Sequence, residues 1–98
     1  MKAYLSLIKH AINDMGYTVS VWDSEEWQVK RSTKYTDIKD AIESVDASEL
    51  VFRDKEGNRT GWAYIVLFGN DPEETVSDYS ISPDHKWIDV WFDRVVMA

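Results

Sequence analysis

The first part of the chain has apolar residues at helical spacing. Residues 3 to 15 repeat them every three or four positions, and Gly16 follows where a helix C-cap belongs. The shared face consists of Leu5, Ile8, Ile12 and Met15. This pattern predicts a helix over residues 3 to 15.

From Tyr17 onward the apolar period changes from helical spacing to two. Tyr17, Val19 and Val21 share one side of an extended strand, and the alternation resumes at Trp27 after the acidic turn 23–26. Two alternating runs joined by a short polar turn are typical of a β-hairpin.

A second hairpin is predicted later, with Leu50 to Lys55 and Arg59 to Phe68 as its arms and residues 56–58 as its turn. The second arm is apolar on both sides, because Trp62, Tyr64, Val66 and Phe68 alternate with Ala63, Ile65 and Leu67. Such a strand is either central in a sheet or half of an interface.

Two more helices follow from the same spacing rule. Thr36 or Asp37 is the expected cap of the second, which has an apolar stripe of Ile38, Ala41, Ile42 and Val45. Asp71-Pro72-Glu73-Glu74 has the order of a capping box and predicts a short helical turn. Ser82-Pro83 opens the final helix, whose wide stripe comprises Trp87, Ile88, Trp91, Phe92 and Val95.

The predicted order is therefore α-ββ-α-ββ-α. Two hairpins with segregated helices favour an α+β fold, in which an antiparallel sheet of about four strands carries helices mainly on one face. A chain of 98 residues without a linker-like stretch is expected to form a single domain, residues 1–98.

The composition indicates the cellular compartment in which such a domain is expected to function. The chain has no cysteine, so a disulfide framework or a cysteine-based zinc site is excluded and the cytoplasm is the expected compartment. The apolar stretch from Tyr4 to Ile12 is interrupted by polar residues, and we interpret it as neither a signal peptide nor a membrane span. No association with a membrane is expected.

No catalytic motif is present in the sequence. His10 and His85 lie far apart, and His10 is interpreted as a helix-surface residue; His85 and Asp89 share a helix face but form at most a weak metal pair. Adjacent carboxylates such as Glu25-Glu26 are solvated turn residues and not a glycosidase pair. We therefore expect no enzyme activity, no metal and no cofactor.

The aromatic content is the most unusual feature of the composition. Five tryptophans are present, and the core of so small a domain is expected to hold about three of them. Trp22 and Trp27 flank the turn that carries Asp23, Glu25 and Glu26, which makes the hairpin tip a candidate contact point. The alternative is that both rings only cover the open side of the hairpin as a cross-strand pair.

The net charge of -7 suggests the electrostatic character of a binding partner. The excess lies in two acidic segments, residues 37–49 and 71–93, and the first forms the outer side of the second predicted helix. These carboxylates would suit a host protein with a basic surface, which the domain would regulate or inhibit. The same spacing also describes an ordinary solvated helix face. The helix carboxylates are Asp37, Asp40, Glu43 and Asp46.

Two other functions stay open. Nucleic acid could bind to the sheet through basic residues near the strand ends and aromatic rings, although the acidic total disfavours it. Those basic residues are Lys30, Arg31, Lys34, Arg53, Lys55 and Arg59. A structural homodimer could also form, through the apolar outer side of the strand from Trp62 to Phe68 or through the helix that carries Trp87 and Trp91.

Three phrases of the sequence resemble small acidic accessory proteins of tailed bacteriophages. They are Val19-Ser-Val-Trp-Asp-Ser-Glu-Glu-Trp-Gln-Val-Lys-Arg-Ser, Glu56-Gly-Asn-Arg-Thr-Gly-Trp-Ala and Asp71-Pro-Glu-Glu-Thr-Val-Ser-Asp-Tyr. The resemblance covers about a third of the chain and transfers no site residue. It implies expression in an infected bacterial cytoplasm and, for some such proteins, inhibition of a host protein.

Overall fold

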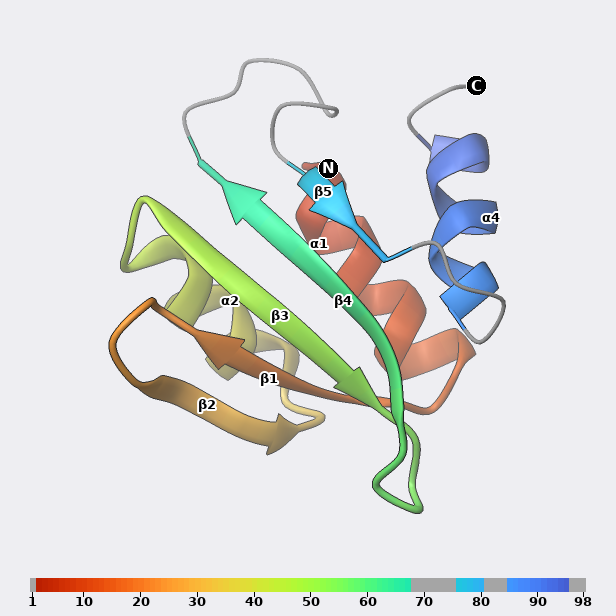
Figure 1. Cartoon of the computed structure of the whole chain (residues 1–98), viewed down its shortest axis with the longest axis horizontal. Helices are drawn as coiled ribbons and strands as arrows, with labels where there is room; N and C mark the ends of the chain where they lie inside the picture. The colour runs from red at the N-terminus through yellow and green to blue at the C-terminus, as the bar shows by residue number, and fades with distance from the viewer. Residues whose placement is uncertain (1, 68–75, 81–84, 96–98) are drawn as a thin grey trace.

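The computed structural model describes residues 2–67, 76–80 and 85–95 (Figure 1). The helices are α1 (Ala3–Lys9), α2 (Tyr35–Glu43) and α4 (Lys86–Val95), and a π-helical segment, His10–Asp14, continues α1. The strands are β1 (Thr18–Trp22), β2 (Trp27–Ser32), β3 (Ala47–Arg53), β4 (Arg59–Val66) and β5 (Val76–Tyr79).

The five strands form one antiparallel sheet in the order β2-β1-β3-β4-β5. The α+β class is thus confirmed, and both predicted hairpins are present as β1–β2 and β3–β4, whereas the expected number of about four strands was wrong. The unpredicted strand, β5, is four residues long and reads Val-Ser-Asp-Tyr, so it has too few apolar residues to produce a pattern of its own. Its pairing with β4 is what makes β4 an interior strand.

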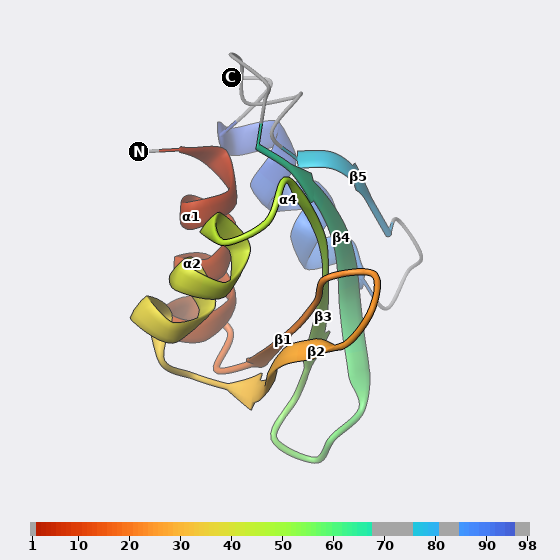
Figure 2. The same cartoon turned by 90° about the vertical axis from the view of Figure 1, so that its left-hand side faces the viewer.

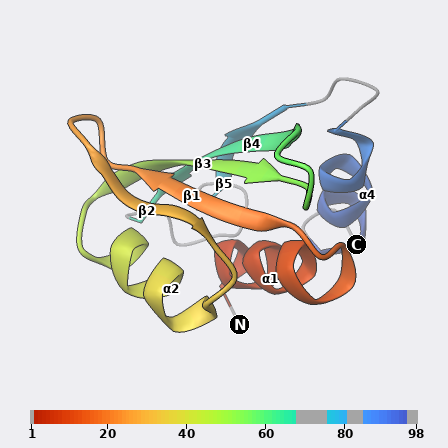
Figure 3. The ribbon, with the colours of Figure 1, turned by 90° about the horizontal axis from the view of Figure 1, so that it is seen from below.

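The helices lie together on one side of the sheet (Figures 2 and 3). Successive side chains of a strand point to opposite faces, so alternate residues of β1, β3 and β4 enter the core. The buried core positions of these strands are Val19, Val21, Leu50, Phe52, Ala63 and Ile65. The helices cover them with Tyr4, Leu7, Ile8, Ile38, Ile42, Ile88 and Trp91.

The predicted helix boundaries hold in part. Gly16 has a positive φ of 72° after the first helix, as a C-cap requires. However, α2 begins at Tyr35 and its N-cap is Lys34, without a side-chain cap, so the expected cap at Thr36 or Asp37 was wrong. In α4, Val95 is 40% exposed and therefore lies outside the buried stripe.

Gly61 of β4 allows α4 to approach the sheet. A Cβ atom at this position would lie 2.6 Å from Ile88 Cδ1, 2.9 Å from Trp87 Cζ2 and 3.2 Å from Phe52 Cδ2. The Trp87 indole also donates a hydrogen bond of 2.6 Å to the carbonyl of Thr60. The missing side chain of Gly61 therefore provides the space in which α4 docks.

The outer strand β2 pairs irregularly with β1. The register shifts twice between them, and Arg31 has a positive φ of 47°. The Arg31 backbone N–H donates to the side-chain Oγ of Ser20 at 2.9 Å. The hairpin is consequently bulged at its edge.

Two predictions fall outside the described residues: the capping-box turn at 71–74 and the start of the last helix at 82–83. Within the described residues, no helix is long and apolar enough to span a membrane.

Candidate binding surface

The sheet face opposite the helices carries three tryptophans. Trp22 and Trp27 are directly paired across β1 and β2, and Trp62 of β4 is paired with Val51 of β3. Trp22 and Trp62 stand next to the core residues Val21 and Ala63, so their rings lie on the side where none of the described helices packs. Trp27 lies on the same side because it is paired directly with Trp22. Trp27 is 41% exposed, and Trp22 and Trp62 are half-buried. We call this side the open face.

These rings surround a hollow of about 290 Å³, the aromatic hollow. The rings of Trp22 and Trp27 meet edge to face, with centroids 5.1 Å apart and planes at 62°. Trp62 Nε1 donates a 3.0 Å hydrogen bond to Glu49 Oε1 on the neighbouring strand. The full lining comprises Trp22, Trp27, Glu49, Val51, Arg59 and Trp62.

The hairpin tip is held by the Asp23 carboxylate. Asp23 Oδ1 accepts the backbone N–H groups of Glu25 at 2.9 Å and Glu26 at 2.8 Å, and Asp23 Oδ2 accepts Gln28 Nε2 at 2.6 Å. Chiefly through the two backbone bonds, the pKa of Asp23 lies below its ordinary value. This ordered turn curls toward the open face (Figure 2) and sets the pairing of Trp22 with Trp27.

A second hollow, of about 230 Å³, adjoins the first on the other side of Trp27. It is lined by the basic residues Lys30, Arg31 and Arg53 together with Ser20 and Trp27, and we call it the basic hollow. The Arg53 guanidinium is fixed by a 2.9 Å hydrogen bond from Nη1 to the carbonyl of Gly57. The open face is therefore acidic and aromatic near the hairpin tip and basic toward the β3–β4 turn.

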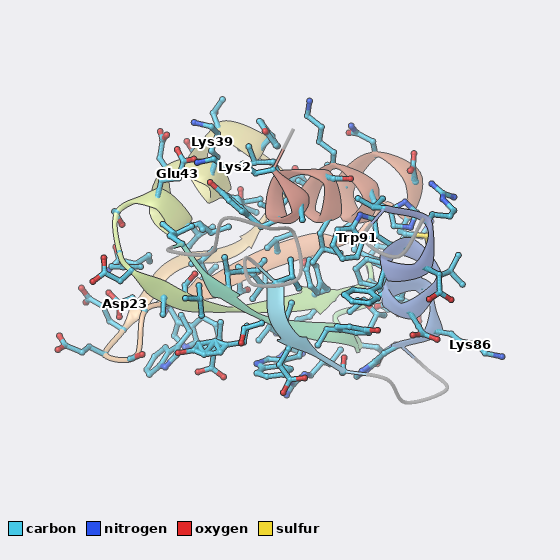
Figure 4. All side chains as sticks on the ribbon, turned by 90° about the horizontal axis from the view of Figure 1, so that it is seen from above. Lys2, Asp23, Lys39, Glu43, Lys86 and Trp91 are labelled. Carbon is cyan, nitrogen blue, oxygen red and sulfur yellow. The ribbon has the colours of Figure 1, made fainter. Side chains whose placement is uncertain are left out.

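The acidic residues of α2 lie elsewhere. Figure 4 shows Glu43 on α2 in the helix layer and Asp23 at the hairpin tip. Asp37 and Asp40 are exposed on α2. Asp46 is also exposed, but its expected place on the second helix was wrong, because α2 ends at Glu43 and Asp46 lies in the turn before β3. Glu43 accepts bonds from Lys39 Nζ at 2.8 Å and Tyr4 Oη at 2.5 Å, which lower its pKa. The structure thus does not bring the two groups of predicted site residues together.

Sequence reasoning missed Glu49 and Val51 as parts of this surface, and it named Arg59 only as a basic residue for nucleic acid. The available signal was the apolar outer side of the strand containing Trp62, which the sequence linked to an interface. What joins Trp62 to the hairpin is the insertion of β3 between β1 and β4. No local pattern specifies that strand order.

Both histidines are engaged by side chains near them. His10 Nδ1 lies 2.7 Å from Asp14 Oδ2, and its ring centroid is 5.8 Å from that of Trp87. His10 is thus half-buried against an aromatic ring, and the expectation of a helix-surface residue was wrong. His85 Nδ1 lies 2.6 Å from Ser80 Oγ, whereas Asp89 accepts a hydrogen bond from Tyr79. The described residues contain no group of three or more metal-ligating side chains.

Comparison with known proteins identified no relative: no protein-family model, no curated protein and no solved structure matches the chain.

Proposed function

We propose that this chain is a non-catalytic domain that binds another protein through the open face of its sheet. The observation that carries the proposal is the position of Trp22, Trp27 and Trp62 on the face that no described helix covers. Tryptophan, tyrosine and arginine are the residues most enriched among binding hot spots, and half-buried rings around a hollow are typical anchors.

The charge of the hairpin suggests the nature of the partner. Glu25 and Glu26 are exposed beside Trp27, and Asp23 forms the turn between them and Trp22. A partner with a basic surface would complement this end of the open face. Such an interaction is consistent with an accessory protein that regulates or inhibits a bacterial host protein, as the resemblance to phage proteins implies.

The carboxylates of α2 belong to a separate surface. Asp37 and Asp40 are exposed on α2, and Glu43 is occupied by Lys39 and Tyr4, whereas Asp46 lies in the turn before β3. We therefore assign them a secondary role, in steering or solubility, and assign the primary contact to the tryptophans.

The test is affinity capture from bacterial lysate with three forms of the tagged protein. They are the parent, a Trp27→Ala/Trp62→Ala variant of the open face, and an Asp37→Asn/Asp40→Asn variant of α2, called the helix variant. We expect a protein that the parent and the helix variant retain and the open-face variant loses, identified by mass spectrometry and verified with the purified partner.

Thermal unfolding of all three forms provides the control for folding. Because Trp27 and Trp62 lie outside the buried core, the open-face variant should unfold cooperatively, with a moderately lower midpoint. Capture that is equal for the parent and a folded open-face variant would contradict the proposal, and loss only in the helix variant would transfer the function to α2.

A second candidate function is favoured by the basic hollow. Lys30, Arg31 and Arg53 stand beside Trp27 on an antiparallel sheet, an arrangement that suits a single-stranded nucleic acid through phosphate contacts and base stacking. Binding of a labelled oligonucleotide that weakens steeply with salt and disappears in Arg31→Ala/Arg53→Ala would support this function instead.

A further inference from the structure

We infer that the aromatic hollow receives a cationic side chain of the partner, an arginine or a lysine. The inference rests on the proposed function, because it names the group that would insert into the open face. It adds a specific pocket, formed by Trp22, Trp27, Trp62 and Glu49.

The first argument is the availability of the indole rings. Aromatic faces attract a cation that comes within about 6 Å of the ring centroid, and tryptophan does so most strongly. Among the described residues, the cation–π contacts join Lys2 to Tyr4 and Lys9 to Tyr35, and none involves a tryptophan. No lysine or arginine of the described residues therefore makes a cation–π contact with the rings around the hollow.

The second argument is the carboxylate in the hollow. Glu49 Oε1 is fixed by the hydrogen bond from Trp62 Nε1, and the described residues offer no hydrogen bond to Glu49 Oε2. A guanidinium or ammonium group in the hollow would therefore meet an oriented negative charge as well as the rings. Glu25 and Glu26 at the nearby hairpin tip also attract a positively charged group.

The size of the hollow supports a single side chain. At about 290 Å³ it lies just below the range of cavities that enclose a drug-sized ligand. Arg59 also lines it and is the one basic residue there, so its charge opposes an incoming cation. This opposition gives the proposal a distinctive consequence, since removal of Arg59 should strengthen cation binding.

The experiment is an NMR titration of the tryptophan indole N–H signals of the parent protein. The probes are arginine amide, lysine amide and citrulline amide, each acetylated at its α-amino group so that only the side chain can carry a charge. The citrulline side chain has nearly the shape of arginine but is neutral. We expect both cations to shift the indole signals of Trp22, Trp27 and Trp62. The signals of Trp87 and Trp91 should stay in place, because their indoles donate to Thr60 and Ser6 away from the hollow. Citrulline amide should cause no comparable shift, and the ratio of the two cation affinities identifies the preferred side chain.

Three variants then test the roles of individual charges. Glu49→Gln should weaken arginine amide binding about fivefold, while Asp40→Asn, which removes a charge on the helix side, should leave it unchanged. Arg59→Ala should strengthen it. The same Arg59→Ala change would weaken binding of an oligonucleotide, so it separates a cation pocket from a nucleic-acid surface.

Equal shifts with citrulline amide, or weaker binding in Arg59→Ala, would overturn the inference. So would a single-stranded oligonucleotide that moves these signals when neither cation does. If the open-face variant loses its protein partner but the cations do not bind, the proposed function is supported and the cation pocket is contradicted. If the cations bind and the partner is retained by the open-face variant, the pocket stands and the proposed function falls.

Discussion

Tyr4 and Glu43, 39 residues apart, join the first two helices through a 2.5 Å hydrogen bond from the phenol to the carboxylate. Tyr4 is fully buried, and burial together with Glu43 raises the pKa of its hydroxyl well above the ordinary value. The hydroxyl therefore stays protonated and remains a donor across the neutral range. Glu43, predicted from sequence as part of an acidic contact surface, thus has an internal structural role.

Replacement of Tyr4 by Phe should lower the free energy of unfolding by about 1 kcal/mol, because it removes a donor to a charged acceptor without changing the packed ring. Chemical denaturation measures the difference. Tyr17→Phe is the control, since the Tyr17 ring packs edge to face on Trp87 and makes no hydroxyl bond among the described residues. Equal losses in both variants would remove the special role of the Tyr4–Glu43 bond.

Gly61→Ala should destabilise the fold by about 2 kcal/mol, because the added methyl group overlaps Ile88 and Trp87 and drives α4 from the sheet. The Trp87 indole NMR signal should shift in the same variant, since its bond to Thr60 depends on that docking.

Ile88→Val provides the matched test of this prediction. Valine lacks the Cδ1 atom that lies nearest to the added methyl group. In the Ile88→Val background, Gly61→Ala should therefore cost clearly less than it does in the parent, which a double-mutant cycle measures. Strict additivity of the two changes would contradict the steric explanation.

The hairpin tip should lose stability in acid. The pKa of Asp23 is depressed below its ordinary value of 3.8 in the folded protein, so its contribution is present above that value and is lost as the pH falls through the folded pKa. The stability difference between the parent and Asp23→Ala should consequently be larger at pH 7 than below pH 3. Urea unfolding at several pH values measures it.

Glu25→Ala serves as the control for the acid effect, since Glu25 is exposed and its side chain makes no hydrogen bond in the described structure. Its difference from the parent should change little with pH. A parent-to-Asp23→Ala difference that stays constant down to pH 2 would show that the carboxylate does not act as an ionised acceptor in the turn.

The elements that the sequence predicted well are those with a local cause. Gly16 ends the first helix because its left-handed backbone suits a C-cap, and the alternation of Val19 and Val21 marks a strand with one side in the core. The hairpin around Asp23 was also predictable, because its turn is closed by hydrogen bonds between residues that are close in sequence.

The missing parts depend on contacts between distant residues. β5 has little apolar character, and its strand conformation follows from pairing with β4. The same holds for the candidate site. The pairing of Trp22 with Trp27 could be predicted from the local sequence. That Trp62 and Glu49 lie beside this pair could be known only once β3 was placed between β1 and β4. The packing of His10 on Trp87 similarly joins the two ends of the chain.

The bulged pairing of β2 also bears on how copies of this molecule behave toward one another. A straight outer strand presents a regular row of unpaired amides and carbonyls, onto which a strand of a second molecule adds. In β2 the backbone at Arg31 turns out of register, and its N–H is already bonded to Ser20. The β2 edge of the sheet is therefore a poor template for edge-to-edge pairing with a second copy of the molecule and for growth into fibres.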